Sequence, residues 1–161
     1  MMSRGQLMAQ LAMMLGGRAA ERVTFDEITT GASNDLERVT QTAKQMVTRY
    51  GMSDKLGPMA LGHSNGQVFM GRDFNAQPDY SDEIAFQIDK EIRRIVDESY
   101  DTAEDLLVRN RALVEKLARD LIEYETVDAR HLKRLVEEFA VDRPPSLEKF
   151  DRDYNSSYQQ D

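Results

Sequence analysis

Apolar residues recur at steps of three and four along most of the chain, which is the spacing of one face of an α-helix. Each stripe is bounded by residues that favour helix ends or turns, such as Ser, Asn and Gly. The pattern therefore predicts a mainly α protein, built as a helical bundle. The five stripes cover residues 3–22, 34–50, 81–110, 110–122 and 126–139.

Three stretches depart from the helical pattern. Gly16 and Gly17 lie inside the first stripe, where they indicate either a kink or break in the helix or another backbone packed very close. Val23–Phe25 is a short β-favouring link. Residues 52–78 are rich in glycine and hold Asn65-Gly66 between two short apolar runs. This segment is predicted to be an irregular or hairpin excursion.

Capping residues predict where the helices begin. Ser3, Ser81, Asn110 and Thr126 stand at the expected starts of four of them, and Asp128 would lie in the first turn of the last. Their hydroxyl or amide oxygens can accept hydrogen bonds from the free N–H groups of a first helical turn.

The segment from Ile28 to Gly51 begins as a turn and continues as a helix. Asn34 is a suitable N-cap with Glu37 three residues later, the spacing of a capping box. Asp35 is then the first helical residue, with its carboxylate at the mouth of the turn. Such a carboxylate either interacts with the helix dipole or serves as a ligand for something outside the helix, and local physics leaves both readings open.

Composition limits the possible functions. The chain of 161 residues has a formal net charge of −8, which argues against nucleic acid as a partner. It has no cysteine, so disulfides and thiolate-ligated metals are excluded. No window of about 18 apolar residues exists, so we expect no membrane contact by this segment. We expect one compact domain over residues 1–141, followed by a polar, disordered tail over residues 142–161.

The histidines offer little catalytic chemistry by themselves. His63 lies in the glycine-rich stretch and His131 on a predicted helix, and neither has a second histidine four residues away. A loop cap at His63 and a surface position for His131 are simpler interpretations than metal ligation. No glycine-rich phosphate loop is present either.

Five short motifs stand out along the chain: LGGRAAE at 15–21, TTGASNDL at 29–36, MVTRYGMS at 46–53, LGP at 56–58 and ETVD at 125–128. In this order they resemble the peptidase domain of the FtsH family, whose members are membrane-anchored AAA+ zinc metalloproteases. The similarity extends over residues 3–140. Residues 65–73 look like the cyanobacterial and plastid branch of that family.

The resemblance implies a role for Asp35. In the family, the Asp of this motif is the third zinc ligand, beside the two histidines of a His-Glu-x-x-His helix. That helix is absent from these 161 residues, as are the transmembrane segments and the ATPase module that takes ATP and magnesium. The chain is therefore expected to be the C-terminal part of the peptidase domain, with no catalytic residue, no cofactor of its own and no activity alone.

The resemblance also implies partners and a location. The intact enzyme would form a homo-oligomeric, hexameric ring and degrade membrane and soluble proteins. This part would be a soluble segment on the cytoplasmic face of a bacterial inner or thylakoid membrane, or on the stromal face in a plastid. The alternative is a non-catalytic helical module for oligomerisation or interaction.

Overall fold

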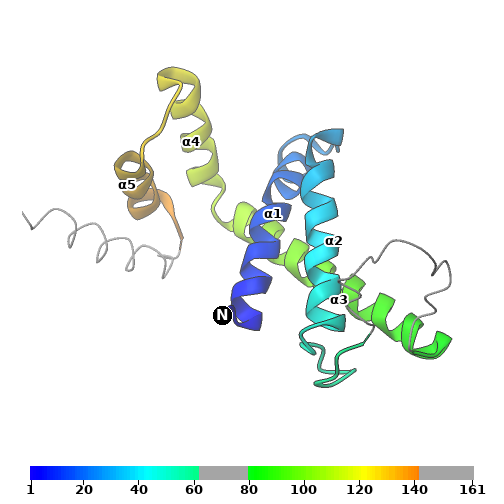
Figure 1. The fold of residues 1–161 in the computed structure, drawn as a ribbon. Coiled ribbons are helices and arrows are strands. Elements are labelled where there is room, and N and C mark those ends of the chain that lie inside the picture. Colours follow the sequence, from blue (N-terminus) through cyan, green and yellow to red (C-terminus); the bar gives the residue numbers. More distant parts are fainter. Residues whose placement is uncertain (62–79, 142–161) are drawn as a thin grey trace, which may run out of the picture. The chain divides into compact units, whose positions relative to one another are not determined.

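The computed structural model describes residues 1–61 and 80–141, and these residues form helices joined by turns, without a strand (Figure 1). The prediction of a mainly α fold is confirmed. The hairpin expected around Asn65-Gly66 and the polar tail from residue 142 lie outside the described residues. The elements in order are α1 (Arg4–Phe25), the 3-10 turn η1 (Thr30–Ala32), α2 (Ser33–Thr48), α3 (Asp82–Arg109), α4 (Arg111–Tyr124) and α5 (Ala129–Phe139).

The chain forms two compact units, the first ending at Asp105 and the second beginning at Leu106. In the first unit, α1 and α2 pack against each other through their apolar stripes. Each fully buried Leu or Val in such a contact contributes about 1.5–3 kcal/mol. The buried residues are Leu7, Leu11, Ala12, Met14, Leu15 and Ala19 on α1, and Val39, Ala43, Met46 and Val47 on α2.

Helix α1 begins at the predicted cap, Ser3, but ends at Phe25 rather than at the predicted Arg22. Ser3 and Gln6 form a capping box, in which each side chain accepts a hydrogen bond from the other residue's backbone N–H. The β-favouring link expected at Val23–Phe25 is wrong, because these residues form the last turn of the helix. Asp26 ends it in the left-handed conformation, with φ of 52°.

The two glycines inside α1 do not break it. The helix runs continuously through Gly16 and Gly17, so the helix-break interpretation is wrong. A Cβ atom placed on either residue would meet nothing within 4 Å in the described part of the chain. The close backbone packing that the sequence suggested is therefore also missing from the described residues.

Helix α3 contributes its residues up to Asp105 to the first unit, and its buried stripe is apolar except for two positions. Ser81 accepts a hydrogen bond from the Ile84 N–H and caps the helix as predicted. The buried side chains are Ile88, Glu91, Ile95, Ser99 and Ala103. The periodicity predicted the apolar members of this face but not Glu91 and Ser99.

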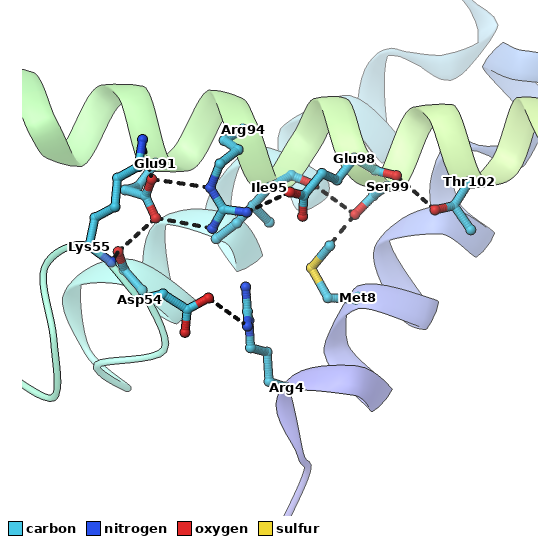
Figure 2. Close-up of polar contacts among 11 residues, drawn as sticks. Arg4, Met8, Asp54, Lys55, Glu91, Arg94, Ile95, Glu98, Ser99 and Thr102 are labelled. Carbon is cyan, nitrogen blue, oxygen red and sulfur yellow. Dashed lines mark hydrogen bonds and ion pairs between the residues drawn. The ribbon is translucent and has the colours of Figure 1, made fainter.

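Glu91 joins α3 to the loop that follows α2. Its side chain is fully buried, and Figure 2 shows Arg94 and Lys55 turned towards its carboxylate. Ser53 donates a hydrogen bond of 2.7 Å to the carboxylate, and Arg94 donates two, of 3.0 and 3.1 Å. The hydrogen bonds from Arg94 are the largest influence lowering the pKa of Glu91. Lys55 Nζ lies 3.7 Å away and adds a weaker attraction.

The loop over residues 49–61 folds back on the end of α2. Gly51 has a φ of +60°, and a Cβ on it would lie 3.0 Å from the backbone Cα of Pro58. The N–H of Leu61 donates to the carbonyl of Thr48 at 2.6 Å. Glycine is therefore required at position 51 by both conformation and space.

In the second unit, α4 and α5 pack together and the caps differ from those predicted. Asp128, not Thr126, caps α5, because its carboxylate accepts the N–H of His131 at 2.7 Å. Asn110 precedes α4 as predicted, but its side chain does not cap that helix. Its amide donates to the Leu106 carbonyl, and its Oδ1 accepts the N–H of Val141 at 2.9 Å.

Candidate functional site

The turn before α2 carries the one metal-ligand candidate named from the sequence, Asp35. The 3-10 turn passes into the helix without a break, since the N–H of Ser33 bonds to the carbonyl of Thr30. The helix therefore begins at Ser33, and Asp35 is its third residue rather than its first. The N-cap expected at Asn34 and its capping box with Glu37 are wrong for the same reason: Ala32 occupies the cap position, without a side-chain cap.

Asp35 is half-buried in the first turn of α2. The free N–H groups of that turn give the helix N-terminus a positive potential, which favours a carboxylate there. None of the hydrogen bonds and ion pairs found within residues 1–61 and 80–141 involves the Asp35 side chain. The helix thus fixes the backbone of Asp35, whereas no polar contact within these ranges restrains its carboxylate.

The carboxylate of Glu21, on α1, restrains the turn that precedes α2. Glu21 accepts the N–H of Thr29 at 3.2 Å on one oxygen and the hydroxyl of Thr29 at 2.5 Å on the other. The hydrogen bond from the hydroxyl is the main reason that the pKa of Glu21 is lowered. Thr29 Oγ1 in turn accepts the N–H of Gly31 at 3.2 Å. Sequence reasoning missed Glu21, although it lies within one of the quoted motifs.

The histidines do not complete a metal site in the described chain. The surface position expected for His131 is wrong. The residue is half-buried between α4 and α5, with Nε2 2.8 Å from Asp120 Oδ2. Lys116 donates to the other oxygen of Asp120 at 2.5 Å, which is the largest effect lowering the pKa of that carboxyl. His63 lies outside the described residues.

A zinc ion requires three or four protein ligands converging at about 2 Å. Over residues 1–61 and 80–141, no three His, Cys, Asp or Glu side chains gather closely enough to hold a metal. Asp35 fits as one carboxylate ligand, but the described residues do not form a zinc site by themselves.

The first unit also has a shallow groove between α2 and α3. Side chains of both charge signs line it, together with the largely exposed Phe86. Lys90 lies over the Phe86 ring, with Nζ 4.5 Å from the ring centroid. Among the described residues, its lining includes neither a histidine nor a serine.

Within residues 1–61 and 80–141, each helix is either too short or too polar to span a lipid bilayer.

Comparison with known proteins shows which protein family the chain resembles. Residues 1–135 match peptidase family M41. The chain is 81% identical over 146 residues, 91% of its length, to the ATP-dependent zinc metalloprotease FtsH of Rubrobacter xylanophilus. It is 52% identical over 136 residues, 83% of its length, to FtsH 3 of Synechocystis, and 47% identical over 136 residues, 84% of its length, to FtsH of Bacillus subtilis. The chain spans only 22, 22 and 21% of these three relatives.

The identities correct one detail of the sequence analysis. The similarity at residues 65–73 suggested a cyanobacterial or plastid branch. The relative from Rubrobacter is 81% identical and the one from Synechocystis 52%, so the branch is not specifically cyanobacterial.

Proposed function

Because the chain belongs to peptidase family M41, as its match over residues 1–135 shows, we propose that it is part of an ATP-dependent zinc metalloendopeptidase. In this proposal Asp35 supplies one ligand to the zinc ion of that enzyme. The two histidine ligands and the catalytic glutamate come from a His-Glu-x-x-His segment outside the 161 residues. The chain alone then has neither peptidase activity nor a complete zinc site.

The position of Asp35 is the observation that carries the proposal. Its carboxylate is half-buried at a helix start and takes part in none of the polar contacts found in the described ranges. The adjoining turn is restrained through Thr29 rather than through Asp35. A ligand that is held by its backbone while its oxygens stay available suits a metal bound by a second element.

A chimera tests the proposal. The matching segment of the Rubrobacter relative, which is 81% identical, is replaced by this chain, and zinc content and ATP-dependent hydrolysis of unfolded casein are measured. We expect Asp35→Ala to reduce zinc from about one to below about 0.1 per chain and to abolish hydrolysis, because a zinc ion that loses one of three protein ligands is bound weakly.

Glu37→Ala is the matched control, since Glu37 is an exposed carboxylate two residues further along the same helix. We expect this variant to keep both zinc and activity. If Asp35→Ala binds zinc as tightly as the control, Asp35 interacts only with the helix N-terminus and the proposal is wrong.

The assembly of the intact enzyme belongs to the same proposal. The relatives are named ATP-dependent proteases, and we propose that the intact enzyme is a membrane-anchored hexameric ring that takes ATP and magnesium at a separate module and degrades proteins. Light scattering of the chimera after size exclusion measures its oligomeric state. A mass of six subunits agrees with the proposal, and a monomer contradicts it.

A further inference from the structure

The segment between α1 and α2 has little apolar burial to hold it in place. Residues 24–31 are all exposed, including Phe25 and Ile28, which are 72% and 60% exposed. Segments with few buried apolar contacts open locally at low free-energy cost unless polar contacts restrain them. The contacts that restrain this turn therefore decide how well the start of α2 is defined.

Glu21 provides such a contact through both carboxylate oxygens. The hydroxyl and the N–H of Thr29 donate to separate oxygens, at 2.5 and 3.2 Å. Arg18, one helical turn earlier, has Nη1 3.6 Å from Oε2 and limits the freedom of the carboxylate. Hydrogen bonds to an ionised acceptor are about twice as strong as neutral ones.

The restraint continues from Thr29 to the helix. Thr29 Oγ1 accepts the N–H of Gly31, and a Cβ on Gly31 would lie 3.3 Å from that oxygen and 3.9 Å from Glu21 Oε1. Ala32 follows and is buried. The N–H of Ser33 then bonds to the carbonyl of Thr30 and begins α2. Every residue from Thr29 to Ser33 is thus fixed by a bond or by burial.

We propose that Glu21 is a positioning residue, whose two-point contact with Thr29 holds the turn that presents Asp35. The functional consequence rests on the proposed role of Asp35 as a zinc ligand, whereas the structural part stands without it. Glu21 acts through the turn and contacts neither the metal nor the substrate.

Amide hydrogen exchange in the isolated chain tests the structural part. Glu21→Gln offers one acceptor oxygen and turns an NH₂ group towards the other donor, so we expect exchange at Thr29 and Gly31 to accelerate about tenfold or more. Thr29→Ser keeps both donors and the acceptor for Gly31, so we expect this variant to retain slow exchange. The control Glu27→Gln, an exposed carboxylate of the same segment, leaves exchange unchanged. Unchanged exchange in Glu21→Gln, or equal acceleration throughout α1 and α2, overturns the inference.

Zinc affinity of the chimera tests the functional part. We expect Glu21→Gln to weaken zinc binding about 10- to 100-fold in a chelator competition, the range for groups that orient a metal ligand. Asp35→Ala removes zinc but leaves Thr29 exchange unchanged. If Asp35→Ala removes zinc and Glu21→Gln binds it with wild-type affinity, the positioning role is refuted while the proposed function stands. If Asp35→Ala retains zinc, the proposed function fails, and exchange at Thr29 alone decides the contact.

Discussion

Replacement of Glu91 by glutamine tests how much the buried polar contact on α3 stabilises the first unit. The side chain is 0% exposed and accepts hydrogen bonds from Ser53 and Arg94. Glutamine keeps one acceptor oxygen for Ser53 but loses the charge that pairs with Arg94. A hydrogen bond to a charged group contributes about 1.5–3 kcal/mol, and leaving one partner of a buried pair alone costs about 3–5 kcal/mol. Because Arg94 is 27% exposed and also binds Glu98, we expect a loss of about 1.5–3 kcal/mol.

Urea denaturation followed by circular dichroism at 222 nm measures this loss. Glu98→Gln is the control, because Glu98 is 50% exposed and bonds to the same arginine at 2.6 Å. An exposed ion pair contributes about 0–1 kcal/mol, so the control should lose no more than that. The reasoning is refuted if the two variants unfold with equal free energies, since burial and the bond from Ser53 would then add nothing.

Two further predictions concern glycine and a buried carboxylate. Gly51→Ala should destabilise the chain by about 1–3 kcal/mol, because position 51 has a φ of +60° and no space for a Cβ, whereas Gly17→Ala inside α1 should stabilise it by up to about 1 kcal/mol. Changes of the same sign in urea denaturation would contradict this. The pKa of Asp120 is lowered below its ordinary 3.8, chiefly by the hydrogen bond from Lys116, so its contribution to stability is complete above pH 3.8 and is lost as pH falls through the lower folded pKa. Circular dichroism between pH 2 and 7 should show this loss in the wild type, and a reduced pH dependence in Asp120→Asn.

Periodicity predicted the helices because apolar side chains three and four residues apart must share one face of a helix. Val39, Ala43 and Met46 are buried as their spacing required. The ends were less predictable, because they depend on backbone conformation. Asp26 in the left-handed region ends α1 three residues later than expected, and the 3-10 turn begins α2 before Asn34.

Long-range polar partners were not predictable from spacing. Glu91 occupies a position that periodicity assigns to an apolar residue, and its partner Ser53 is 38 residues away in a loop. His131 looked like a surface residue because its partner Asp120 lies on the neighbouring helix. Such contacts depend on tertiary packing, which a single sequence pattern does not specify.

The candidate site was predictable in part. Capping preferences placed Asp35 in the first turn of a helix, two residues from its actual position in that turn, and the motif resemblance supplied the idea of a zinc ligand. The contact between Glu21 and Thr29 was not predictable, because eight residues separate them and the chain reverses direction in between. Only the folded turn brings these groups together.

The hydrogen bond between Asn110 and Val141 joins the residue before α4 to a residue just after α5. The chain enters α4 and leaves α5 at one point, joined by a contact of 2.9 Å. A segment whose two ends meet can be exchanged for another helical hairpin by altering two adjacent junctions. We therefore expect that residues 110–141 can be replaced by another helical hairpin with only two junctions to redesign, both at this contact.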